Sequence, residues 1–214
     1  MTEAEWLASE DPFEMFERVR PAISARKVRL LGCACLSWVW RWGMEETIPE
    51  AIHTAEAFAD GLATGEDLTC AAGDLAVLRR EYEEPWRPYP RALELTELLT
   101  SPDSPHEWIS ELRVFGTDMF VIDEPEWKKM GNLARDVFGN PFRPATFDTA
   151  WRTSTVVSLA SQMYESRDFG AMPILADALQ DAGCDSDDIL SHCRDAKHPH
   201  VRGCWVVDLV LGKE

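Results

Sequence analysis

Basic clusters are missing from this chain. Among its 214 residues 38 are acidic and 21 are basic, the formal net charge is −17, and no basic run exceeds two residues. Proteins that bind nucleic acid neutralise phosphates with clustered Lys and Arg, so we expect no direct binding to DNA or RNA. An acidic surface can instead steer a protein toward a basic protein partner.

A long apolar segment is missing as well. The longest, LLGCACLSWVW, covers eleven residues between Arg29 and Arg41, whereas a membrane-spanning helix needs about 20. The opening MTEAEWLASEDP is acidic where a signal peptide carries basic residues. Without such a signal, the six cysteines indicate reduced thiols rather than a disulfide framework. The sequence therefore predicts a cytoplasmic protein that does not enter a membrane.

The motifs of the common enzyme classes are also missing. The chain contains no GxSxG, GxGxxG, GxxxxGK or HExxH, and HEWIS lacks the second histidine of a zinc-protease motif. The sequence thus points to no particular reaction. It leaves open whether the protein is an enzyme and favours a function without catalysis.

Helix-start signals, in contrast, recur along the chain. Thr2 with Glu5 and Thr64 with Asp67 have the spacing of a capping box, and Asp11 precedes a proline at the first helical position. Apolar residues at helical spacing follow each signal, whereas strand-like runs are confined to RVFGTDMFVID and CWVVDLVL. The pattern predicts an all-α fold, an orthogonal bundle of about ten to twelve helices. They cover residues 3–9, 12–19, 24–42, 48–60, 65–83, 91–100, 105–115, 125–138, 153–166, 171–182, 186–194 and 204–211.

The length suits a single helical domain over residues 1–214. A boundary between two lobes is predicted at 83–92, EEPWRPYPRA, where three prolines favour an extended segment. Trp86 and Tyr89 in this segment are candidate binding residues, because aromatic rings can dock such a segment onto a partner surface.

A second proline-rich stretch, GNPFRPATFD at 139–148, holds Arg143 between two prolines. Arg143 could serve as a rigid hook for an anionic ligand, or it could pair with a nearby carboxylate in an ordinary loop. Both interpretations stay open from the sequence.

The segment SHCRDAKHPHVRGCW at 191–205 holds three of the five histidines and two of the six cysteines. The favoured interpretation is a packed joint between helices, in which cysteines fill the core as small apolar side chains. One alternative is a thiol–imidazole active site in a pocket lined by His192, His200 and Cys193. The other is a structural zinc site, although paired CxxC spacing is absent. Its predicted ligands are Cys184, Cys193, His200 and Cys204.

The blocks GNPFRP, PILADALQDAGC, ILSHCR and HVRGCWVVDLVLGKE resemble those of a planctomycete-type bacterial family. The resemblance implies a bacterial cytoplasmic protein but assigns no activity, cofactor or site residue. The family has a Gly/Pro-rich turn where this chain has DAKHP, which makes His198 a poor candidate for a site shared by the family. We therefore predict a soluble acidic interaction module without a cofactor, either an adaptor or a neutralising partner of a basic protein. The alternative is an enzyme or metal-binding protein that uses the C-terminal Cys/His cluster.

Overall fold

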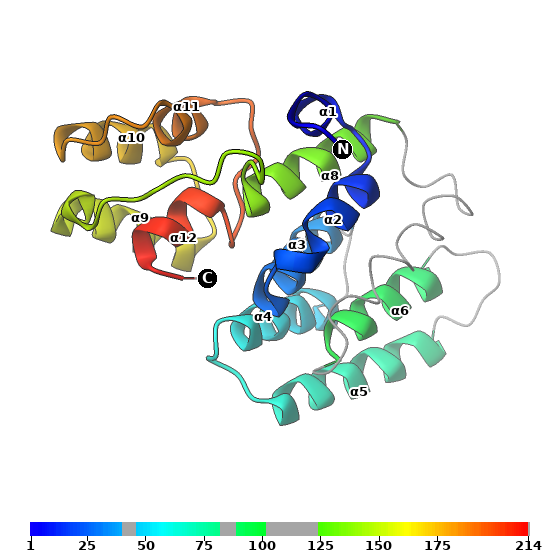
Figure 1. Cartoon of the computed structure of the whole chain (residues 1–214). Helices are drawn as coiled ribbons and strands as arrows, with labels where there is room; N and C mark the ends of the chain where they lie inside the picture. The colour runs from blue at the N-terminus through cyan, green and yellow to red at the C-terminus, as the bar shows by residue number, and fades with distance from the viewer. Residues whose placement is uncertain (40–45, 82–88, 102–123, 214) are drawn as a thin grey trace. The chain divides into compact units, whose positions relative to one another are not determined.

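The computed structural model describes residues 1–39, 46–81, 89–101 and 124–213. These residues form eleven α-helices and two short 3-10 helices, with no strand among them (Figure 1). The all-α fold predicted from the sequence is therefore confirmed, while the helix predicted at 105–115 lies outside the described residues. Within the described ranges, no helix combines the length and the apolar character needed to cross a bilayer.

The chain divides into two compact units. Unit 1 contains Met1–Val19 and Lys129–Glu214, and unit 2 contains Arg20–Lys128. The lobe boundary predicted at 83–92 falls inside unit 2, and residues 82–88 lie outside the described ranges.

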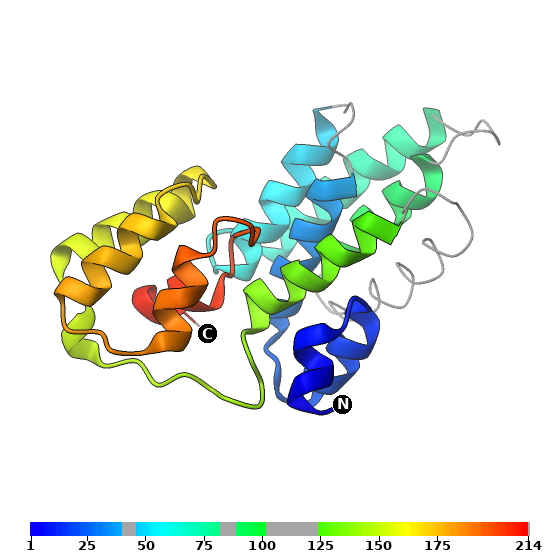
Figure 2. The same ribbon diagram turned by 90° about the horizontal axis from the view of Figure 1, so that it is seen from above.

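Unit 2 is built around α3 (Ala25–Val39), a helix that is apolar on most of its faces. Its elements are η1 (Arg20–Ala22), α3 (Ala25–Val39), α4 (Thr47–Ala59), α5 (Gly65–Glu81) and α6 (Tyr89–Leu99), of which α3 to α6 pack side by side (Figures 1 and 2). The buried Arg29 of α3 donates to the carbonyl oxygens of Leu99 and Ser101. Carbonyls at a helix end have no partner within the helix, so this guanidinium caps the end of α6.

Unit 1 contains the remaining helices. They are α1 (Glu3–Ala8), α2 (Pro12–Val19), the end of α8 (Glu124–Phe138), η2 (Thr149–Trp151), α9 (Ser154–Ser166), α10 (Met172–Asp181), α11 (Asp187–Arg194) and α12 (Trp205–Leu211). Helices α9 to α12 enclose one apolar core (Figure 1). Helix α1 begins with the predicted capping box, in which the Glu5 N–H donates to the Thr2 hydroxyl at 3.3 Å.

Arg135 of α8 binds the N-terminal segment of unit 1. Arg135 donates to the carbonyl oxygens of Trp6 and Ser9, at 3.1 and 2.8 Å. A charged donor shared by two backbone carbonyls makes stronger hydrogen bonds than a neutral one. Arg135 thus holds the segment that contains α1 against the last turns of α8. The next residue in the helix is Asp136.

Candidate metal centre

The site begins with a carboxylate on the apolar side of a helix. Asp136 has a fully buried side chain and lies in α8 among the buried residues Leu133, Ala134 and Val137. Gly139 directly follows the helix, and its φ of +67° lies in the left-handed region that favours glycine. A buried carboxylate needs hydrogen-bond donors or a cation to offset the lost hydration.

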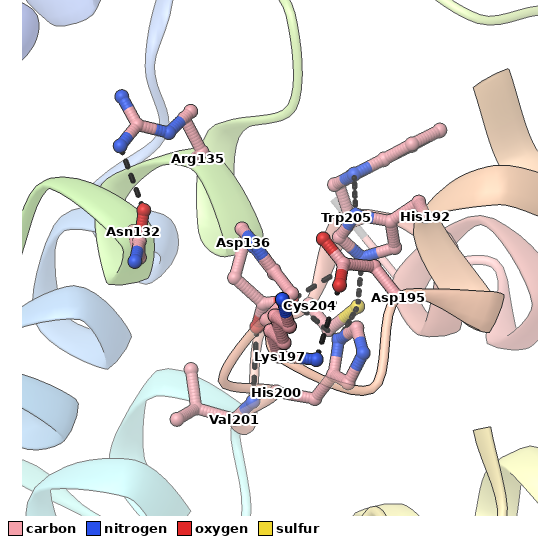
Figure 3. Close-up of polar contacts among 11 residues, drawn as sticks. Asn132, Arg135, Asp136, His192, Asp195, Lys197, His200, Val201, Cys204 and Trp205 are labelled. Atoms are coloured by element: carbon pink, nitrogen blue, oxygen red, sulfur yellow. Dashed lines mark hydrogen bonds and ion pairs between the residues drawn. The ribbon is translucent and has the colours of Figure 1, made fainter. Parts of the chain in front are cut away.

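Three histidines and one cysteine surround this carboxylate. Figure 3 shows His192, His200 and Cys204 beside Asp136. The Oδ1 atom of Asp136 lies 2.8 Å from His200 Nδ1, 3.2 Å from His192 Nε2 and 3.9 Å from His198 Nε2. The Sγ atom of Cys204 lies 3.2 Å from His192 Nε2 and 4.0 Å from His200 Nδ1. Four side chains, Asp136, His192, His200 and Cys204, thus direct one ligand atom each into a group that spans at most 4.8 Å.

The loop between α11 and α12 brings these side chains together. The Lys197 N–H donates to Asp195 Oδ1 at 3.0 Å, and the His198 N–H donates to the Asp195 carbonyl at the same distance. Further along, the Val201 N–H donates to Asp136 Oδ2 at 2.9 Å. The first pair of bonds turns the chain back after α11, and the third fastens the loop to the end of α8.

The four ligand atoms lie within 4.8 Å of one another, and the nitrogen–oxygen and nitrogen–sulfur distances among them are near the spacing of ligands around one metal ion. In a tetrahedral zinc site with bonds of about 2.0–2.3 Å, the ligand atoms lie about 3.3–3.7 Å from one another. The nitrogen–oxygen and nitrogen–sulfur distances between the four side chains range from 2.8 to 4.0 Å and scatter around that spacing. An ion could therefore be accommodated by small movements of side chains that already face a common point.

The same geometry disagrees with a Cys–His–Asp catalytic triad. A triad histidine contacts the nucleophile with one ring nitrogen and the carboxylate with the other. Here the thiol of Cys204 and the carboxylate of Asp136 both face Nε2 of His192. Both groups also face the same nitrogen of His200, its Nδ1. Convergence on one nitrogen of each ring differs from a triad and is compatible with side chains that face one ion.

The outer nitrogen of His192 is held by an indole. The Trp205 Nε1–H donates to His192 Nδ1 at 3.2 Å, which fixes the orientation of the imidazole. Because an indole N–H can only donate, the neutral His192 carries its proton on Nε2, the nitrogen that faces Asp136 and Cys204. An ion bound at Nε2 would replace this proton, so we expect metal binding to release protons.

The electrostatics keep Asp136 ionised and Cys204 protonated. Burial alone would raise the pKa of Asp136, but hydrogen bonds from His192 and His200 outweigh it and hold the pKa below its usual range. Burial raises the pKa of the Cys204 thiol well above its ordinary value, and the charge of Asp136 raises it further. A divalent cation would reverse this second effect, because it favours the thiolate as a ligand.

Two neighbouring side chains, His198 and Cys193, are neutral at neutral pH. Burial lowers the pKa of His198 to about 4, although the charge of Asp136 opposes this shift. Burial raises the pKa of Cys193 to about 12. The imidazole of His198 is therefore in the unprotonated form that can bind a metal, while the Cys193 thiol is not a reactive thiolate at neutral pH.

The structure brings together two of the four ligands predicted from the sequence. His200 and Cys204 belong to the group around Asp136, whereas Cys184 and Cys193 are buried in the apolar core of unit 1. Cys184 follows Gly183, which ends α10, and its N–H donates to the Leu179 carbonyl at 2.9 Å. This is the helix ending in which the residue after the glycine packs back onto the helix.

Arg143, one of the three candidate binding residues, is not among the four side chains of this group. Arg143 donates to Glu3 Oε1 at 2.5 Å, so it pairs with a carboxylate, the second of the two roles that the sequence left open. Tyr89 is the first residue of α6 in unit 2. Trp86 lies outside the described residues.

Asp136 is the residue of the candidate centre that sequence reasoning missed, and the sequence places His192 only in the alternative active-site pocket. Asp136 is 56 residues from His192 along the chain, so no local spacing connects the two. One signal was present: an aspartate stands directly before Val137, within the apolar series of an amphipathic helix. A charged residue at such a position indicates either a buried partner or a site.

Comparison of the chain with models of known protein families, with curated proteins and with solved structures finds no match. The assignment of the centre therefore depends on its geometry and on the chemistry of its side chains.

Replacement of Gly139 tests how closely the end of α8 packs against Trp205, the residue that donates to His192. A Cβ at this position would lie 3.2 Å from the ring of Trp205, and the φ of +67° disfavours any other residue. We expect Gly139→Ala to lower the free energy of unfolding by about 2–3 kcal/mol, since backbone strain and overpacking add. Gly183→Ala is the control, because its φ is also positive but no atom lies within 4 Å of the added Cβ. Equal losses in urea denaturation would show that the contact with Trp205 is unimportant.

Proposed function

We propose that this protein binds one transition-metal ion, with zinc as the best fit, through Asp136, His192, His200 and Cys204. The observation that carries the proposal is the convergence of four ligand atoms of three chemical types within 4.8 Å. Two imidazoles, a thiolate and a carboxylate form a ligand set that suits zinc, whereas calcium and magnesium prefer oxygen ligands alone.

The ion would have a structural role. The side chains of Asp136, His192 and His200 are 0%, 11% and 7% exposed, and Cys204 is fully buried. Buried protein ligands would surround the ion and leave no position for water, as in structural zinc sites. The ligands come from α8, from α11 and from the segment that leads into α12. A bound ion would thus fasten three segments of unit 1 to one another.

Metal analysis of the purified, untagged protein tests the proposal. We expect about one zinc ion per chain after dialysis, and a loss of more than about tenfold in zinc affinity for Cys204→Ser, because the hydroxyl is a poorer zinc ligand than the thiolate. Inductively coupled plasma mass spectrometry gives the stoichiometry, and competition with a chromophoric chelator gives the affinity.

Cys70→Ser is the matched control, since Cys70 is an exposed thiol on α5 in unit 2. Zinc affinity that is unchanged in Cys70→Ser but reduced in Cys204→Ser supports the proposed centre. Absence of zinc from protein that has been offered the ion, or equal binding by both variants, would contradict it.

Three expectations from the sequence stay predictions. The acidic composition supports a basic protein partner, and the charge of −17 is compatible with such a role beside a structural ion. A cytoplasmic location likewise stays a prediction. Membership of the planctomycete-type family is proposed from the sequence blocks quoted above.

A further inference from the structure

The group around Asp136 contains a third histidine to which the proposed centre gives no role. His198 has a side chain that is 14% exposed, and its Nε2 atom is buried without a hydrogen-bond partner. Leaving a buried polar atom unpaired costs about 1–3 kcal/mol. A polar group in this position therefore calls for an explanation.

The position of the unpaired nitrogen indicates a ligand. His198 Nε2 lies 3.9 Å from Asp136 Oδ1, the oxygen that already faces His192 and His200. The His198 ring packs against both of these imidazoles, with centroids 5.1 Å from His192 and 5.5 Å from His200. All three histidines thus gather around the same carboxylate oxygen.

The backbone also holds His198 in place. The hydrogen bonds from the N–H groups of Lys197 and His198 to Asp195 form a turn directly after α11. This turn directs the chain back toward the end of α8 before it reaches His200. His198 Nε2 thus lies at the edge of the group of four side chains, 3.9 Å from Asp136 Oδ1, and a movement of the side chain would bring it to the ion.

We propose that His198 is a fifth donor to the metal ion, so that the centre holds three imidazoles, one carboxylate and one thiolate. This inference depends on the proposed metal binding and adds to it a coordination number and one further ligand. Zinc has four ligands in most structural sites, but its coordination can expand to five. The fifth ligand closes the centre further against water and gives the unpaired nitrogen a partner.

Cobalt(II) spectroscopy of full-length protein separates four ligands from five, because four-coordinate cobalt absorbs visible light more strongly. The variant His198→Phe keeps a ring of similar size but removes the nitrogen. We expect its cobalt complex to absorb more strongly than that of the unmodified protein, and its cobalt affinity to fall about ten- to a hundredfold. A role in packing alone would not raise the absorption.

Lys197→Gln, an exposed change in the same turn, is the control and should leave the spectrum and the affinity unaltered. X-ray absorption of the unmodified zinc protein gives a second measurement that needs no variant, and we expect scattering from three imidazoles. Two imidazoles, or a His198→Phe complex identical to that of Lys197→Gln, would overturn the role of His198 while the metal site itself stands. Failure of the unmodified protein to bind either metal would overturn both.

Discussion

Removal of the metal ion is expected to destabilise unit 1 by about 4 kcal/mol, when zinc-loaded protein at a free zinc concentration of about a thousand times Kd is compared with chelated protein. The reason is that an ion that binds only the folded state adds its binding free energy to folding. For a unit of this size, the loss corresponds to a fall in Tm of about 15 °C or more. Differential scanning calorimetry with and without a chelator measures it.

Hydrogen exchange shows where the loss occurs. The amide of Val201, which donates to Asp136, should lose protection when zinc is removed, together with the amides of α12. Helix α4 of unit 2 is the internal control, because it contributes no ligand to the centre. An unchanged Tm and unchanged exchange would favour the packed joint without metal, the interpretation that the sequence alone favoured.

The helices could be predicted from the sequence because their signals are local. Thr2 and Glu5 lie three residues apart and form the capping box that their spacing predicts. Gly139 and Gly183 follow the ends of helices with a positive φ. Helices commonly end at a residue of positive φ, and glycine adopts that conformation without strain. Such signals depend on a few neighbouring residues, and distant contacts altered them little in this chain.

The metal centre could be predicted only in part, because its residues meet through tertiary packing. His200 and Cys204 lie four apart and were recognised together. The sequence predicts Cys193 as a ligand and not its neighbour His192. Adjacent residues of a helix point about 100° apart, so only one of the two can face the candidate centre. Cys193 continues the buried face of Ile189 and Leu190, so it enters the apolar core while His192 faces the centre.

The remaining ligand, Asp136, needed a contact that no spacing encodes. Its burial depends on how the loop after α11 packs on the end of α8, which is a property of the folded unit. The histidines and the cysteine of the candidate centre can thus be found in one segment near the C-terminus. Its carboxylate comes from a helix more than fifty residues earlier in the sequence.

Asp136 is expected to stabilise unit 1 even without metal. In chelated protein its replacement should therefore cost more stability than the replacement of Cys204. Its Oδ1 accepts from His200 and its Oδ2 accepts from the Val201 N–H, at 2.8 and 2.9 Å. An asparagine has only one acceptor oxygen, so Asp136→Asn would leave one of these donors facing an NH2 group. Breaking a buried, charged network in this way costs about 3–5 kcal/mol.

In chelated protein we therefore expect Asp136→Asn to lower the free energy of unfolding by about 3–5 kcal/mol in urea denaturation, and Cys204→Ser by about 1–2 kcal/mol. With zinc present, both variants should lose the stabilisation that the ion gives to the unmodified protein. Asp177→Asn is the control within unit 1, because its exposed pair with Arg194 contributes little. If Asp136→Asn is as mild as Asp177→Asn in the chelated state, Asp136 acts only as a metal ligand and its hydrogen bonds do not hold the loop to α8.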